Sequence, residues 1–242
     1  MDIVFLSSLA KIMLVNVVLS GDNAVVIAMA ARGLPSHQQK GAILWGSGGA
    51  VVLRILLTLA AVALLKVPFL QFVGGILLMW IAYQLLIEED KEVGEDPNGK
   101  HGLMAAVKTI LIADVVMSLD NTLAIAGVAK GNYLLLGLGL ALSIPLVIFG
   151  SAVIMKAMDR FPFLVYLGAG LIAYTAGEMI DGDKAVIPYM PHFLHGTPYL
   201  AVIITAVVVG IGYLQNLRSG RTAHDVLVSG EHAAERMGNR LD

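Results

Sequence analysis

Two short polar segments, each inside a long apolar stretch, carry the residues of this chain best suited to chemistry. Residues 16–23 read Asn-Val-Val-Leu-Ser-Gly-Asp-Asn, and residues 114–121 read Asp-Val-Val-Met-Ser-Leu-Asp-Asn. We call them the first and second Asp-Asn motifs. A charged side chain at the centre of a bilayer costs about 2.5–3.5 kcal/mol on insertion scales, so an aspartate kept there is a default candidate for function. We therefore expect the two motifs to meet and to bind a cation between them.

The side chains of both motifs are oxygen donors. The candidate metal ligands are Asp22, Asn23, Asp120, Asn121, Asp114 and Asn16, with Ser20 and Ser118 as supporting hydroxyls. Sites built only from oxygen suit hard cations such as Mg²⁺, Ca²⁺ and Mn²⁺. The alternative is that these polar side chains only join helices by hydrogen bonds.

The spacing of the motifs predicts how they face. In a continuous helix, positions seven apart lie on one face. Three polar side chains of each motif then form a stripe: Asn16, Ser20 and Asn23 in the first motif, and Asp114, Ser118 and Asn121 in the second. Asp22 and Asp120 lie about 100° round the helix from the neighbouring asparagine. Gly21 favours local unwinding in the first motif, whereas Leu119 stands at the matching place in the second.

Two further charged residues are candidates for supporting roles. Arg54 lies midway along the second expected helix, and a lone intramembrane charge usually finds a partner. We expect it to pair with an aspartate when no cation is bound; a structural pair and a gate are the alternatives. Glu178 lies near the outer end of the sixth expected helix and is a candidate vestibule ligand, although interfacial carboxylates are more often only solvated.

The elements that must position these residues are membrane helices. The chain has 242 residues, of which 57% are hydrophobic and 14% charged, and its mean hydropathy is +0.80. A membrane-spanning helix needs about 20 mostly apolar residues. The segments that qualify are residues 3–30, 41–65, 68–87, 103–128, 133–156, 162–180 and 197–215. We predict an all-α, polytopic membrane protein of about seven transmembrane helices, with a single transmembrane domain over residues 1–215 and a polar cytoplasmic tail over residues 216–242.

An internal duplication relates the two motifs. Residues 16–33 and 114–131 are identical at nine of eighteen aligned positions, including Ser20/Ser118, Asp22/Asp120 and Asn23/Asn121. Repeat one covers about residues 3–87, repeat two about residues 103–180, and an extra helix follows at 197–215. Each repeat has three helices, so the second enters the membrane from the opposite face. Inverted repeats of this kind are a transporter architecture, with the site at the repeat interface near the midplane.

Several function classes are excluded or disfavoured by the residues present. Cysteine is absent, which excludes disulfides and thiolate metal sites. The chain has no phosphate loop, nucleotide fingerprint or metalloprotease motif, so we expect neither an enzyme nor a permanently bound cofactor. We expect a divalent cation and the lipid bilayer as partners and no nucleic acid. Self-association and membrane-protein partners stay open.

The two motifs carry a family resemblance. The stretches NVVLSGDNAVVIA and DVVMSLDNTLAIAG, each on the first helix of a repeat, resemble the TerC family of integral membrane proteins. The similarity is to its short YjbE-type branch, within the wider LysE-like transporter superfamily. The resemblance implies manganese export across the bacterial cytoplasmic membrane, with the intramembrane acidic residues as ligands. It carries over to Asp22, Asn23, Asp120 and Asn121, and it extends to Asn16 and Asp114.

Two alternatives of other classes stand beside a Mn²⁺ exporter. One is a membrane assembly factor for exported proteins, in which the motifs are structural. The other is a LysE-like exporter of a small organic solute. The second is disfavoured by the absence of aromatic or arginine recognition groups near the motifs, and because three aspartates would repel a carboxylate-bearing substrate.

The distribution of basic residues predicts the orientation. Lysine and arginine concentrate in the cytoplasmic loops of membrane proteins. On the side of the N-terminus lie Lys66, Lys130 and Lys184; on the other side lie Arg32, Lys40, Lys91, Lys100, Lys108, Lys156, Arg160, Arg218, Arg221, Arg236 and Arg240. We predict an inner-membrane protein with its N-terminus outside and its C-terminus in the cytoplasm. A C-terminal epitope tag should react with antibody only after the cells are permeabilised, and labelling of intact cells would contradict this orientation.

Overall fold

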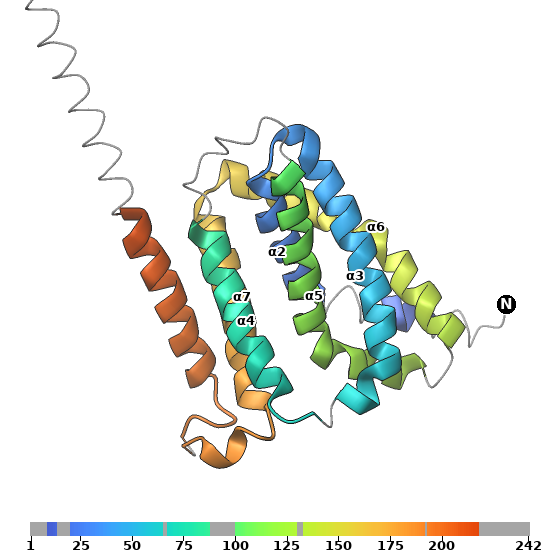
Figure 1. Cartoon of the computed structure of the whole chain (residues 1–242), viewed down its shortest axis with the longest axis vertical. Helices are drawn as coiled ribbons and strands as arrows, with labels where there is room; N and C mark the ends of the chain where they lie inside the picture. The colour runs from blue at the N-terminus through green and yellow to red at the C-terminus, as the bar shows by residue number, and fades with distance from the viewer. Residues whose placement is uncertain are drawn as a thin grey trace, which may run out of the picture.

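The described part of the chain is a bundle of helices. The computed structural model describes residues 9–13, 20–64, 67–87, 100–129, 133–191 and 193–217. Its helices are α2 (Gly21–Arg32), α3 (Ser36–Leu64), α4 (Leu70–Ile87), α5 (Lys100–Ala129), α6 (Tyr133–Arg160) and α7 (Phe163–Gly182) (Figure 1). A short 3-10 helix, η2 (Ile187–Tyr189), precedes a last helix, Tyr199–Leu217, which we call the C-terminal helix.

The prediction of an all-helical, multi-pass membrane protein is confirmed. Within the described residues, six helices are long and apolar enough to cross a membrane: α3 to α7 and the C-terminal helix. The expected first span, residues 3–30, is described only at residues 9–13, which are helical, and from Ser20 onward. The predicted tail lies outside the described residues beyond Leu217.

Two helices extend further than their hydropathy predicts. We expected the second helix to begin at residue 41, but α3 begins at Ser36, directly after Pro35. The backbone N–H of Gln38 donates to the carbonyl of Pro35 at 2.8 Å, which closes the first turn of this polar segment. Likewise α6 continues to Arg160, whereas residue 156 was the expected end. Backbone hydrogen bonds stabilise these turns outside the apolar span, so hydropathy marks only the apolar part of each helix.

The helices pair as inverted repeats require. The faces of α3 and α5 meet at Gly41 with Leu103, Gly46 with Ile110, and Gly49 with Leu111. These contacts advance together along both helices, so α3 runs parallel to α5. The short turn after Arg32 makes α2 antiparallel to α3, and α2 and α5, the first helices of the two repeats, therefore run in opposite directions (Figure 1). The corresponding pair, α6 and α2, also packs together. The third helices of the two repeats, α4 and α7, pack against each other.

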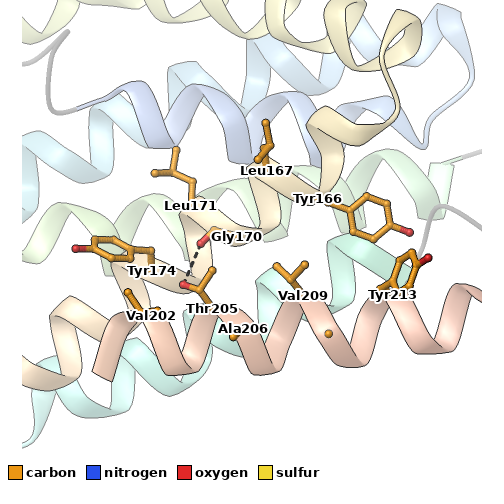
Figure 2. A pocket seen from close by; sticks show the side chains of 11 residues that line it. Tyr166, Leu167, Gly170, Leu171, Tyr174, Val202, Thr205, Ala206, Val209 and Tyr213 are labelled. Atoms are coloured by element: carbon orange, nitrogen blue, oxygen red, sulfur yellow. Dashed lines mark hydrogen bonds between the residues drawn. The ribbon is translucent and has the colours of Figure 1, made fainter. Parts of the chain in front are cut away.

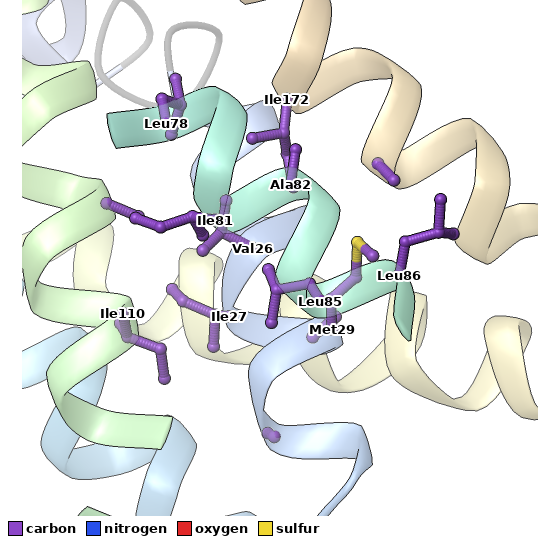
Figure 3. Packing of buried hydrophobic residues seen from close by; sticks show 14 of the residues in the cluster. Val26, Ile27, Met29, Leu78, Ile81, Ala82, Leu85, Leu86, Ile110 and Ile172 are labelled. Atoms are coloured by element: carbon purple, nitrogen blue, oxygen red, sulfur yellow. The ribbon is translucent and has the colours of Figure 1, made fainter. Parts of the chain in front are cut away.

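The apolar core lies between α2, α4, α5 and α7. Val26, Ile27 and Met29 of α2 face Leu78, Ile81 and Leu85 of α4, with Ile110 of α5 and Ile172 of α7 beside them (Figure 3). Lipid tails are as apolar as these side chains, so the packing between the helices, not a hydrophobic transfer term, must hold this core together in a bilayer.

The C-terminal helix lies at the edge of the bundle, against α7 (Figure 1). Gly177 of α7 faces Ala201, and the side-chain amide of Asn216 donates to the Tyr166 hydroxyl at 3.0 Å. Between the two helices runs an apolar groove of about 770 Å³, with Tyr166 and Tyr213 near one end and Tyr174 near the other (Figure 2). The groove contains none of the predicted site residues, and this supports a peripheral place for the helix.

The close approach at Gly177 generates a prediction. A Cβ atom there would overlap the backbone of Ala201, whereas a Cβ atom at Gly210 would meet no atom within 4 Å. Overpacking costs about 1–3 kcal/mol, so Gly177→Ala should lower the Tm by roughly 2–12 °C for a chain of this length. The matched control, Gly210→Ala, should leave the Tm unchanged or raise it slightly. Thermal unfolding in detergent measures both, and equal values for the two variants would contradict the packing described.

Candidate cation site between the repeats

A buried arginine joins the two Asp-Asn motifs. Arg54, on α3, has 4% of its surface exposed. Its Nη1 donates to the hydroxyl of Ser20 at 2.8 Å, and its Nε donates to the hydroxyl of Ser118 at 3.0 Å. Its Nη2 lies 2.5 Å from Oδ1 of Asp114, which completes a buried ion pair. We call Arg54, Ser20, Asp114 and Ser118 the Arg54 cluster.

The second Asp-Asn motif contributes Asp114 and Ser118 to this cluster from a continuous helix. α5 runs continuously from Lys100 to Ala129. Asp114 and Ser118 are one turn apart and therefore share a face. The Ser118 hydroxyl also donates to Oδ2 of Asp114 at 3.3 Å, so both carboxylate oxygens of Asp114 are engaged. Helical continuity keeps the predicted stripe on one side of α5.

The first Asp-Asn motif contributes Ser20 to the cluster from the start of a helix. α2 begins at Gly21, where the sequence favoured unwinding, and Ser20 stands at its N-cap position. The Ser20 side chain makes no capping hydrogen bond to the backbone. Its hydroxyl accepts from Arg54 instead, so the residue that would ordinarily close the helix end belongs to the cluster.

Asp22 is the second carboxylate at this place. It lies in the first turn of α2, where the partial positive charge of the helix N-terminus favours an anion. The backbone N–H of Asn23 donates to its Oδ1 at 2.8 Å. Across the described residues its carboxylate forms no ion pair, so it is available to a ligand.

Among the described side chains, the charges of this region do not cancel. One guanidinium, Arg54, stands with two carboxyl groups, Asp22 and Asp114, which gives a formal charge of −1 when all three are ionised. Arg54 and Asp114 are fully buried, and Asp22 is half-buried. An excess charge in a low-dielectric interior is costly unless a counter-charge is present. The arrangement therefore favours binding of a further positive charge.

Other predicted site residues fall outside the cluster or outside the description. Asn16 lies among residues 14–19, which the structure does not describe. Asp120 belongs to the α5 backbone, but its side chain is not described; Asn121 is half-buried on the same helix. Glu178 is exposed on α7, apart from the buried cluster. Among the described side chains, no three carboxylate or histidine groups gather as a metal cage.

The cluster corrects one argument from the sequence. We expected no arginine recognition group near the motifs, and this is wrong because Arg54 contacts both. The expected pairing of Arg54 with an aspartate is present. The sequence carried the signal, a single cation at membrane depth, but gave no indication of which helices α3 packs against. That parallel packing on α5 brings residues 60 positions apart into contact.

Comparison with known proteins places the chain in a family. A family model described as the integral membrane protein TerC family matches residues 1–223. The chain is 46% identical over 207 residues to the uncharacterised membrane protein YjbE of Bacillus subtilis, covering 85% of this chain and 93% of that protein. It is 28% identical over 199 residues to the uncharacterised membrane protein YceF of the same organism, covering 79% and 75%.

A more distant relative comes from another bacterium. The inner membrane protein YgdQ of Escherichia coli is 20% identical over 235 residues, covering 88% of this chain and 94% of that protein. No solved structure matches the chain. The family match spans nearly all the helices, including both Asp-Asn motifs. The chain therefore belongs to the TerC family of integral membrane proteins.

Proposed function

We propose that this protein exports a divalent cation, with Mn²⁺ as the favoured ion, across the bacterial inner membrane. The observation that carries the proposal is the uncancelled negative charge at the junction of the two repeats. Asp22 offers a carboxylate with no ion pair among the described residues, and Asp114 offers one held by Arg54. The oxygen donors suit a hard cation, and the family resemblance favours manganese among these ions.

Arg54 acts in this proposal as the counter-ion of the empty transporter. Without a cation, its guanidinium neutralises Asp114 and bonds a serine of each motif. Of the two carboxylates, the cation binds Asp22 before Asp114, because Asp22 has no ion-pair partner among the described residues. The cation then competes with Arg54 for Asp114. Asn23, Asp120, Asn121 and Asn16 are proposed further ligands.

Inverted repeats support a way to move the ion. The first helices of the two repeats run in opposite directions and both reach the cluster, so a rocking of one repeat against the other exposes the site to alternate sides. Release returns Asp114 to Arg54, and this exchange neutralises the carboxylate while the empty transporter resets. We expect no covalent chemistry and no resident cofactor.

Arg54 also favours a second candidate, the export of a small zwitterionic solute. A guanidinium binds a carboxylate in a planar, two-pronged geometry. Asp22 would then bind the ammonium group of the same solute. The two candidates differ in cargo and share a site, so competition decides between them. A third candidate is a membrane assembly factor for exported proteins, in which the Arg54 cluster is purely structural.

Removing the unpaired carboxylate tests transport. Asp22→Asn should reduce Mn²⁺ uptake into proteoliposomes at least about tenfold, equivalent to about 1.4 kcal/mol at the barrier, with the Tm nearly unchanged because no ion pair is lost. The matched control is Asp159→Asn, which removes only the exposed pair with Arg32 (Nε–Oδ1 3.0 Å) and should transport normally. A fluorescent indicator inside the vesicles reports Mn²⁺, with Mg²⁺, Ca²⁺, Zn²⁺ and neutral amino acids as competitors. Full activity in Asp22→Asn would contradict the site; competition by amino acids alone would favour the zwitterion.

Replacing the whole ion pair tests whether the cluster is only structural. Arg54→Met leaves Asp114 buried without its partner and should lower the free energy of unfolding by about 3–5 kcal/mol. Adding Asp114→Leu removes the stranded charge and should recover most of that stability, because apolar side chains of similar volume can replace a buried pair. The double variant should nevertheless fail to transport. Thermal unfolding and vesicle uptake measure the two effects, and a stable double variant with normal uptake would leave the cluster without a part in transport.

A further inference from the structure

Two buried polar side chains beside the Arg54 cluster have no partner. Asn23 on α2 and Ser47 on α3 each have 2% of their surface exposed. Neither the amide oxygen and nitrogen of Asn23 nor the hydroxyl of Ser47 forms a hydrogen bond within the described part of the chain. Buried polar groups are nearly always satisfied, and an unsatisfied one in a native structure calls for a missing ligand, ion or water. Ser47 is outside both Asp-Asn motifs.

The two side chains lie on the same side of the cluster. Ser47 is seven residues before Arg54 and therefore shares its face of α3. Asn23 is three residues after Ser20, whose hydroxyl bonds Arg54. Because α2 and α3 are antiparallel neighbours, moving from Ser20 to Asn23 and from Arg54 to Ser47 leads in one direction, toward the turn between the two helices. Both side chains thus lie about one to two turns beyond the cluster.

We infer that Asn23 and Ser47 form a second, uncharged subsite for the transported cation. It lies between the Arg54 cluster and the turn that joins α2 to α3. The inference rests on the proposed function and assigns Ser47 a part in it. An amide oxygen and a hydroxyl replace hydration water one oxygen at a time. They hold a divalent ion more weakly than carboxylates do, so the ion passes on to Asp22 and Asp114. In the predicted orientation this subsite is on the cytoplasmic side and is the entry step of export.

The Ser47→Ala variant distinguishes a role in cation binding from a structural role. Removing a hydroxyl that has no partner should leave the Tm of the metal-free protein unchanged or slightly higher. The maximal rate of Mn²⁺ uptake should fall about fivefold, the change expected when one oxygen contact is lost at the barrier. The Mn²⁺ concentration that gives half-maximal thermal stabilisation should stay within about twofold, because the Arg54 cluster is intact. Asn23→Leu, of similar volume, should slow uptake in the same way.

Thr58→Val is the matched control. Thr58 is a buried hydroxyl on the same face of α3, on the other side of Arg54, and it donates to the Arg54 carbonyl at 2.7 Å. This variant should transport at nearly the wild-type rate. The subsite is overturned if Asp22→Asn abolishes uptake while Ser47→Ala and Asn23→Leu transport normally, or if Ser47→Ala lowers the Tm without slowing uptake. Absence of Mn²⁺ uptake by the wild-type protein would instead overturn the proposed function.

Discussion

The buried ion pair between Arg54 and Asp114 is the interaction on which the rest of the structure depends. A guanidinium inside a membrane must find a counter-charge and fill its remaining donors. Arg54 does both with residues from the two repeats, because Ser20 precedes α2 while Asp114 and Ser118 lie on α5. α3 must therefore pack along α5, and the glycines on that face allow the approach. The residues of the candidate site are therefore also residues that hold the two repeats together.

The repeats share a pattern but divide the charge unequally. The first motif has Asn16 where the second has Asp114, and this difference predicts that the second repeat carries more of the charge. Asp114 is the aspartate that Arg54 holds, with both of its oxygens engaged. Asp22, at the start of α2, is left with a backbone contact and no ion pair among the described residues. One carboxylate is thus masked and the other is available, a division suited to a carrier that must both capture and release its cargo.

Unsatisfied polarity is concentrated around this junction. The uncancelled charge lies at the cluster, and Asn23 and Ser47, without partners, lie just beyond it. The apolar groove beside the C-terminal helix has no such groups and faces outward, as a surface in contact with lipid does. In a bilayer, every polar group that the protein does not satisfy is expensive. The proposed path of the cargo therefore follows these unsatisfied groups.

The amino-acid pattern alone was sufficient to predict an all-helical, multi-pass membrane protein and the approximate positions of the described membrane helices. Hydropathy and motif identity can be read from local composition. Hydropathy did not predict polar helical turns such as Ser36–Lys40. The oxygen donors and the pairing of Arg54 were also predictable, because an intramembrane charge needs a partner. Which helix supplies that partner was not, and for this reason the argument against a small-solute exporter overlooked Arg54 beside the motifs. Ser47, in a glycine-rich stretch, resembled an ordinary packing residue. Its burial and missing partner arise only when α3 packs against the neighbouring helices, since contacts between helices depend on side chains that are far apart in the chain.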